Sequence, residues 1–283
     1  MATFTNRATL SYNGGAVDSN TVTGTFLETL AITKTATVQT YSTGSRVTYA
    51  VGLVNSGSTS FAGLTLTDDL GGYAFGETTV YPLNYVDGSL LYYVNGTLQA
   101  TPTIGATQPL TVGGISVPAG GNALIVYTAD VGAAAPPVVD GSVVNTATIS
   151  GGGLTEALSA TETITAQNQP ELSITKSLAP TAVPENGTIT YSFLIENSGN
   201  TDAVATDNLT VTDVFDPILD ITSVTLNGVI LTEGTDYTYD PATGVFATVP
   251  GVITVEAATF TQGADGAYLV APGSAVLTVT GTI

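Results

Sequence analysis

The chain has 283 residues, 4 lysines and arginines against 23 acidic residues, a net charge of −19, and no cysteine, histidine or tryptophan. So few cations cannot neutralise phosphates, which argues against nucleic-acid binding and against attraction to anionic membranes. Without histidine and cysteine the chain cannot build a Ser-His triad, a thiol nucleophile, the usual structural zinc site or a disulfide. We therefore expect neither a conventional enzyme nor a cofactor.

Hydrophobic residues make up 43% of the chain, too many for a disordered acidic protein, and the length fits about two domains. No stretch approaches the ~20 apolar residues of a transmembrane helix. The opening MATFTNRATL has neither the basic segment nor the apolar core of a signal peptide, which leaves the export route open.

Alternating polar and apolar residues, rich in Val, Ile, Thr and Tyr, run through most of the chain from the N-terminus onward. The dipeptides Asn95-Gly96 and Asn227-Gly228 are typical of two-residue hairpin turns. No segment has a helical apolar stripe. The pattern predicts an all-β protein built from immunoglobulin-like sandwiches.

An internal repeat aligns LAITKTATVQTYSTGSRVTYAVGLVNSG with LSITKSLAPTAVPENGTITYSFLIENSG without a gap, so that Lys34 aligns with Lys176, 142 residues later. Further on, LTLTDDL aligns with LTVTDVF, which matches Asp68 with Asp213. The first copy continues through VVNTATISGGGLTEALSATETIT, a segment that has no counterpart after residue 169.

A counterpart of that segment lies at the N-terminus, where FTNRATLSYNGGAVDSNTVTGTF places Asn6 on Asn145, Ala8 on Ala147 and Leu10 on Ile149. The sequence therefore predicts a donor hairpin (1–26), a complete sandwich (27–168) and a sandwich that lacks its closing strands (169–283). An incomplete sandwich has an open sheet edge, which normally has to be paired or covered.

Two arrangements would complete the second sandwich: the hairpin folds back within its own chain, or it enters a neighbouring molecule. We favour the neighbour, because few residues join the hairpin to the first sandwich. Head-to-tail contacts of this kind generate open filaments. Burial of five apolar side chains of the hairpin would contribute roughly 10 kcal/mol before ordering costs. These side chains are Phe4, Leu10, Tyr12, Val17 and Val22.

Strand alternation places three polar residues on apolar faces of the first sandwich. Lys34 follows Leu30 and Ile32, Asp68 follows Leu64 and Leu66, and Asn145 lies between Val143 and Ala147. The second sandwich repeats the pattern with Lys176 and Asp213, while its asparagine, Asn6, is on the donor hairpin. These are the only lysines in the chain. A buried lysine tends to become a neutral nucleophile, and a buried carboxyl can polarise an amide carbonyl.

This constellation resembles that of bacterial pilin and adhesin sandwiches that form Lys-Asn isopeptide bonds with the help of an acidic residue. The segments ITKTA, VTYAVGLVNSG, TLTDDL and VNTATIS are similar to a bacterial surface-protein repeat family of unknown function. The resemblance implies an intramolecular Lys34–Asn145 bond assisted by Asp68. It implies an intermolecular Lys176–Asn6 bond assisted by Asp213. It also implies an extracellular location on a bacterial cell or spore surface.

Simpler interpretations of the same residues remain open. Lys34 and Lys176 can be buried ion-pair partners of the aspartates, without any bond. Acidic residues such as Asp236 and Asp240 lack the ligand spacing of a calcium loop, so we expect no metal site. The favoured function is a structural subunit of a self-assembling filament whose partner is a second copy of itself. The alternative is a monomeric surface adhesin module that binds a ligand.

Overall fold

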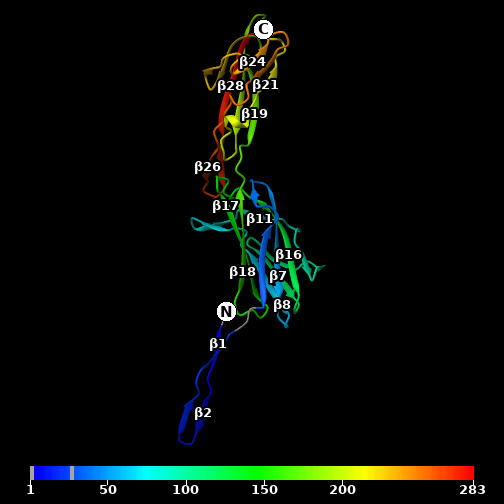
Figure 1. The fold of residues 1–283 in the computed structure, drawn as a ribbon, viewed down its shortest axis with the longest axis vertical. Helices are drawn as coiled ribbons and strands as arrows, with labels where there is room; N and C mark the ends of the chain where they lie inside the picture. The colour runs from blue at the N-terminus through cyan, green and yellow to red at the C-terminus, as the bar shows by residue number, and fades with distance from the viewer. Residues whose placement is uncertain (1–2, 26–28) are drawn as a thin grey trace. The chain divides into compact units, whose positions relative to one another are not determined.

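The computed structural model describes residues 3–25 and 29–283, and β-strands dominate all of this part of the chain (Figure 1). The predicted all-β class is confirmed. The one helical element of these residues is a short 3-10 helix, η1 (Ala205–Asp207), and none of their helices is long and apolar enough to cross a membrane. The boundary expected between residues 26 and 27 lies outside the described residues.

The chain divides into two compact units. Unit 1 runs from the N-terminus to Pro136 and from Ser142 to Thr165. Unit 2 comprises Pro137–Gly141 and Ala166–Ile283.

The N-terminal hairpin consists of two short antiparallel ladders, drawn in blue in Figure 1. In one ladder Asn6 is opposite Val22, and in the other Thr9 is opposite Asp18. Two residues lie between Asn6 and Thr9, but three lie between Asp18 and Val22, so the returning strand carries one extra residue. This bulge places Val22 on the same face as Val17. The strands are β1 (Thr3–Asn6), β2 (Thr9–Tyr12), β3 (Gly15–Asp18) and β4 (Val22–Thr25).

Unit 1 contains a sandwich of two six-stranded sheets, whose facing residues alternate with exposed ones along each strand. The first sheet has β5 (Leu30–Ala36), β7 (Arg46–Asn55), β16 (Asn122–Val131), β12 (Leu91–Val94), β13 (Thr97–Leu98) and β11 (Leu83–Tyr85). The second has β14 (Thr103–Thr107), β15 (Leu110–Val117), β8 (Phe61–Asp68), β17 (Ser142–Gly151), β18 (Leu158–Ala166) and β6 (Thr40–Tyr41). A small ladder joins β9 (Tyr73–Phe75) and β10 (Thr78–Val80).

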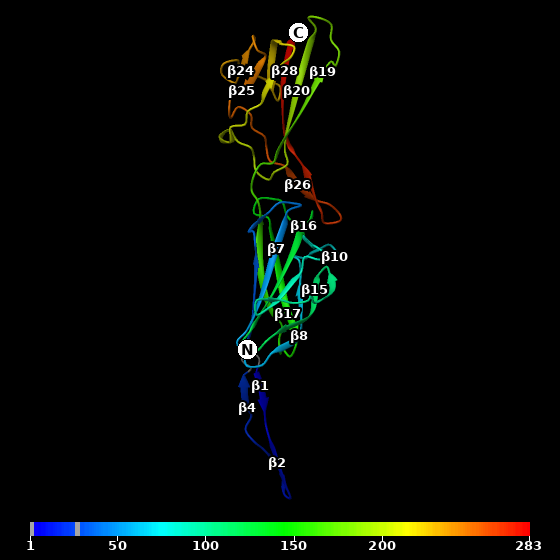
Figure 2. The ribbon, with the colours of Figure 1, turned by 90° about the vertical axis from the view of Figure 1, so that its right-hand side faces the viewer.

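Unit 2 repeats the first sheet almost strand for strand, and Figure 2 shows β19, β20 and β28 together in one layer and β24 and β25 in the other. The first sheet has β19 (Leu172–Ala179), β20 (Thr188–Asn197), β28 (Gly273–Thr282), β22 (Asp220–Leu226) and β23 (Val229–Ile230). The second has only β21 (Thr212–Val214), β25 (Val245–Thr248) and β24 (Tyr237–Asp240). A separate ladder joins β26 (Thr259–Gln262) and β27 (Tyr268–Ala271).

Two buried asparagines occupy the same position of the repeat, Asn55 at the end of β7 and Asn197 at the end of β20, and each fixes the end of its strand. The Asn55 amide donates to the Thr59 and Pro118 carbonyls and accepts from the Gly57 N–H. Asn197 makes the corresponding bonds in unit 2, to Thr201, Glu256 and Gly199. Satisfying these buried backbone groups accounts for the repeated asparagine, so Asn55 and Asn197 are structural residues.

Candidate functional site

The centre of unit 1 contains a buried charge pair between the two sheets. Lys34 lies on β5 and Asp68 at the end of β8, and Lys34 Nζ is 2.6 Å from Asp68 Oδ2, with both side chains 0% exposed. Alternation explains the placement, because Lys34 is two and four residues from Ile32 and Leu30 and therefore shares their inward face. Asp68 also accepts a hydrogen bond from the Leu70 N–H.

Burial lowers the pKa of Lys34 from its ordinary value of 10.5, while the nearby carboxylates, chiefly Asp68, act in the opposite direction. Desolvation is the larger effect, because water that would solvate an ammonium is excluded from the core. The lysine nitrogen is therefore pushed toward the neutral form, which has the lone pair that a nucleophile needs.

Asn145 completes this site from β17, the strand hydrogen-bonded to β8 in the register Ala147 opposite Asp68. It is 0% exposed, and its Nδ2 donates to the Tyr127 hydroxyl at 3.2 Å. Its Oδ1 has no hydrogen-bond partner among the described residues. Leaving a buried amide oxygen without a hydrogen bond is energetically costly.

Two tyrosines flank the side chains of Lys34, Asp68 and Asn145. The rings of Tyr49 and Tyr127 stack with centroids 5.5 Å apart, and Lys34 Nζ lies 5.0 Å from the centroid of the Tyr49 ring. Burial raises the pKa of both hydroxyls, and the nearby Asp68 carboxylate acts in the same direction. Sequence reasoning missed Tyr127, although the inward parity of β16 was a usable signal.

Asp69, the residue after Asp68, is half-buried and organises the turn after β8. Its Oδ1 accepts hydrogen bonds from the Gly71 and Thr146 N–H groups. The Gly71 bond stabilises the turn and the Thr146 bond fixes the end of β8 against β17, so Asp69 supports the site without entering it.

The corresponding ion pair is also present in unit 2, but it is exposed to water. Lys176 on β19 forms an ion pair with Asp213 on β21, yet their side chains are 40% and 17% exposed. Aromatic rings again surround the lysine, with Nζ 4.6 Å from the Tyr191 centroid and 5.5 Å from the Phe215 centroid. In unit 1, Tyr127 on β16 lies opposite Tyr49 on β7. In unit 2, Tyr191 corresponds to Tyr49, and the residue opposite it is Val279, which therefore occupies the position of Tyr127.

The exposure of Lys176 has a clear structural origin in the strand order. In unit 1, β8 is hydrogen-bonded on one side to β15 and on the other to β17. In unit 2, β21 is hydrogen-bonded to β25, and its other edge has no partner among the described strands. Residues 169–283 contain no strand at the place of β17 and β18.

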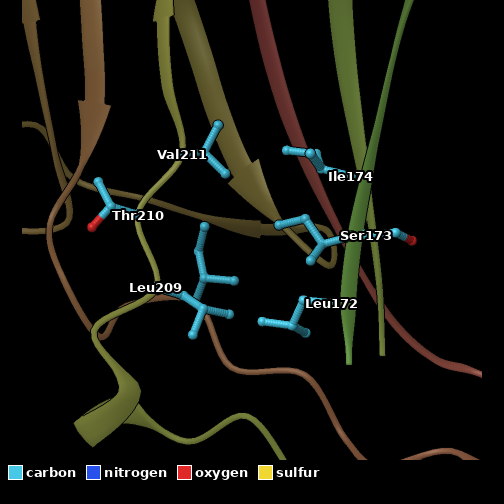
Figure 3. A pocket seen from close by; sticks show the side chains of 8 residues that line it. Leu172, Ser173, Ile174, Leu209, Thr210 and Val211 are labelled. Atoms are coloured by element: carbon cyan, nitrogen blue, oxygen red, sulfur yellow. The ribbon is translucent and has the colours of Figure 1, made fainter. Parts of the chain in front are cut away.

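An apolar groove of about 180 Å³ opens along this edge (Figure 3). Leu172, Ile174, Leu209 and Val211 point into it, whereas Ser173 and Thr210 point away. Leu172 is 43% exposed and Ile174 56%, although Leu30 at the place of Leu172 in unit 1 is 4% exposed. The complete lining is Leu172, Ser173, Ile174, Ile195, Leu209, Thr210, Val211 and Ile253.

The N-terminal hairpin also exposes apolar side chains. Asn6 is exposed, and β1 to β4 are hydrogen-bonded to none of the other strands in the described part of the chain. The structure therefore brings Lys34, Asp68 and Asn145 together, and brings Lys176 to Asp213, but leaves Asn6 apart from them. The exposed apolar side chains of the hairpin are Phe4 50%, Leu10 67%, Tyr12 60%, Val17 52% and Val22 57%.

The weaker acidic candidates have local roles. Asp236 accepts from the Thr232 N–H, Asp240 binds Ala242 N–H and the Thr243 hydroxyl, and Asp18 pairs with Arg7. Within residues 3–25 and 29–283, no three acidic residues gather into a potential metal site.

No protein-family model and no curated protein sequence matches this chain. Among solved structures, BcpA, the major pilin subunit of Bacillus cereus, is 11% identical with a TM-score of 0.36, over 96% of this chain and 73% of BcpA. The pilus backbone RrgB of Streptococcus pneumoniae is 11% identical with a TM-score of 0.36, over 86% of this chain and 55% of RrgB.

The collagen-binding subdomain ACE19 of the Enterococcus faecalis surface protein ACE is 10% identical with a TM-score of 0.31, over 51% of this chain and 100% of ACE19. These solved structures are of the pilin and adhesin classes that the sequence segments resemble.

Proposed function

We propose that this chain is the subunit of an extracellular filament that grows head to tail. The hairpin of one molecule enters the open groove in unit 2 of the next and supplies the strands that unit 1 has as β17 and β18. One observation carries the proposal: β21 has an edge without a strand partner where β8 binds β17, and β1 and β2, which pair only within the hairpin among the described strands, align in sequence with β17.

Unit 1 supplies the register for the donated strand. There, Ala147 lies opposite Asp68 and Ile149 opposite Leu66. Transferred along the aligned sequences, Ala8 lies opposite Asp213, Leu10 opposite Val211 and Thr9 opposite Thr212. Phe4, Asn6, Ala8, Leu10 and Tyr12 alternate along one continuous segment, so all five face the groove.

Burial of apolar surface from both partners drives this association. The exposed hairpin side chains cover Leu172, Ile174 and Leu209, which line the groove. Each fully buried Leu, Val or Phe contributes about 1.5–3 kcal/mol, which offsets the entropy lost on docking. Main-chain hydrogen bonds to the edge of β21 add directional specificity, as in other strand-addition complexes.

The same docking places an asparagine beside a lysine and an acid. Asn6 takes the place of Asn145, and Lys176 and Asp213 take the places of Lys34 and Asp68. Attack of the lysine nitrogen on the amide carbon releases ammonia and leaves an isopeptide bond. The Lys34–Asn145 bond closes within unit 1, whereas the Lys176–Asn6 bond joins two subunits and makes the filament covalent.

A cysteine cross-link tests the docking directly, because the natural chain has no cysteine. Cross-strand neighbours have Cβ atoms about 4.5–5.5 Å apart, within reach of a disulfide after small adjustment. A Thr9→Cys/Thr212→Cys double variant, made with Lys176→Ala to prevent other cross-links, should give a ladder of oxidised multimers that a reductant dissolves.

The matched control is Asp18→Cys/Thr212→Cys. Asp18 lies opposite Thr9 on the next strand of the hairpin, about 9–10 Å from Thr212 in the docked arrangement, too far for a disulfide. Cross-linking within one chain would show that the hairpin folds back on its own unit 2. Absence of any Thr9–Thr212 cross-link would contradict donation and favour the adhesin function.

A further inference from the structure

The buried groups of unit 1 include a hydroxyl that the bond-forming pair alone does not require. Lys34 Nζ donates to Asp68 Oδ2 at 2.6 Å, and the Asp68 carboxylate lies near enough to the Tyr127 hydroxyl to help raise its pKa. The same hydroxyl lies 3.2 Å from Asn145 Nδ2, the nitrogen that has to leave. Tyr127 thus contacts the leaving group and lies near the acid.

We propose that Tyr127 is a catalytic residue of the Lys34–Asn145 reaction. Its hydroxyl transfers a proton from Asp68 to the departing amide nitrogen. This inference rests on the isopeptide bond of the proposed function and deepens it. Amide nitrogen is a poor leaving group unless it is protonated, and a site at 0% exposure holds no bulk water to supply the proton.

Protons and bonds balance in this reaction. The Lys34 ammonium gives one proton to the Asp68 carboxylate, and the neutral amine attacks Cγ of Asn145. In the tetrahedral intermediate Nδ2 gains a lone pair, takes a proton from the Tyr127 hydroxyl, and Tyr127 takes one from Asp68. The Cγ–Nδ2 bond breaks and ammonia leaves. The surplus proton on Nζ returns to Asp68, so the products are an amide, a protonated Asp68 and ammonia.

Other tyrosines of unit 1 supply an internal comparison. The Tyr85 ring lies 6.5 Å from that of Tyr127, but the Tyr85 hydroxyl is buried without a hydrogen-bond partner among the described residues. Of the two, Tyr127 is the one whose hydroxyl is hydrogen-bonded to Asn145. In unit 2 the ring beside Tyr191 is Phe215, which has no hydroxyl, and Val279 occupies the position of Tyr127. The bond between subunits therefore has no relay and forms more slowly.

The test follows the loss of ammonia by intact mass after cell-free synthesis of the full chain. General acid catalysis contributes typically 100-fold or more, so Tyr127→Phe should close the Lys34–Asn145 bond about 100-fold more slowly. Tyr85→Phe, which removes an unpartnered hydroxyl from the same core, should close at the wild-type rate.

Folding is checked separately in the Lys34→Ala background, where no bond can form in unit 1. Equal melting temperatures with and without the added Tyr127→Phe substitution show that the slower reaction is chemical. If the Tyr127→Phe variant forms the bond as fast as the wild type, or if Tyr85→Phe slows bond formation equally, the proton relay is wrong, whereas the Lys34–Asn145 bond is still supported. If the wild-type protein keeps the full mass of its sequence, the Lys34–Asn145 bond itself is wrong.

Discussion

Lys34 and Lys176 occupy the same position of the repeat, but the Lys34 side chain is 0% exposed and the Lys176 side chain is 40% exposed. The local partners are equivalent, since each lysine pairs with an aspartate and lies over a tyrosine ring. The difference comes from β17 and β18, which cover Lys34 and have no counterpart over Lys176. The exposed fraction of this lysine side chain therefore indicates whether closing strands cover the site.

The first prediction concerns the bond within unit 1. The wild-type chain should weigh less than its sequence by one ammonia per subunit, and Lys34→Ala should restore that mass because no nucleophile remains. Intact mass spectrometry of the unassembled subunit makes the measurement. Asp130→Ala, which breaks the exposed pair with Arg46, is the control and should leave the ammonia loss intact. A Lys34→Ala chain that still lacks the ammonia would contradict the assignment.

The second prediction concerns the bond between subunits. Filaments boiled in detergent should give a ladder of multimers, and Lys176→Ala or Asn6→Ala should reduce it to a single monomer band. Electron microscopy of the same samples should still show filaments, because apolar docking does not need the bond. Lys34→Ala should keep the ladder. A ladder that survives in Lys176→Ala would show that another linkage holds the subunits.

The third prediction concerns the apolar face of the donated strand. Leu10 faces the groove in the transferred register, and adjacent Ser11 faces the opposite side. Loss of one buried leucine costs about 2 kcal/mol, which corresponds to an about 30-fold weaker association. Leu10→Asp should therefore raise the concentration needed for filament formation at least 30-fold, measured by light scattering in the Lys176→Ala background. Ser11→Asp adds the same charge and should have little effect; equal effects would contradict this register.

Alternation was enough to predict the all-β class and the inward faces of the strands that carry Lys34 and Asp68. Side chains alternate between the two faces of a strand, so assigning Leu30 and Ile32, or Leu64 and Leu66, to the core also fixes the direction in which Lys34 or Asp68 points. The Tyr127 contact could not be predicted, because parity tells which side chains point inward and not which of them meet.

The returning strand of the hairpin shows a second limit of the sequence. A gap-free alignment matches Val22 with Thr161, but in the structure Val22 lies opposite Asn6, as Glu162 lies opposite Asn145. The loop between Leu10 and Val17 is two residues shorter than the loop between Ile149 and Leu158, and the extra residue between Asp18 and Val22 offsets one of the two. The gap-free alignment is therefore out of register by one residue at Val22, and no side-chain pattern in this polar segment reveals it.

The last prediction concerns pH and the buried charge of unit 1. In an Asn145→Ala chain, which cannot form the bond, Lys34 remains a titratable amine whose folded pKa lies below 10.5. Between that lowered pKa and 10.5 the unfolded state binds more protons than the folded state, so the free energy of unfolding rises with pH, by at most about 1.4 kcal/mol per unit. Above 10.0 the sign reverses, because burial raises the pKa of Tyr49 and Tyr127 and the unfolded tyrosines lose their protons first. Urea unfolding of unit 1 between pH 7 and pH 10, followed by near-ultraviolet circular dichroism, should show this rise, and Lys34→Met/Asp68→Leu in the same Asn145→Ala chain should abolish it. An equal slope in that apolar control would mean that the pH dependence arises from groups other than Lys34.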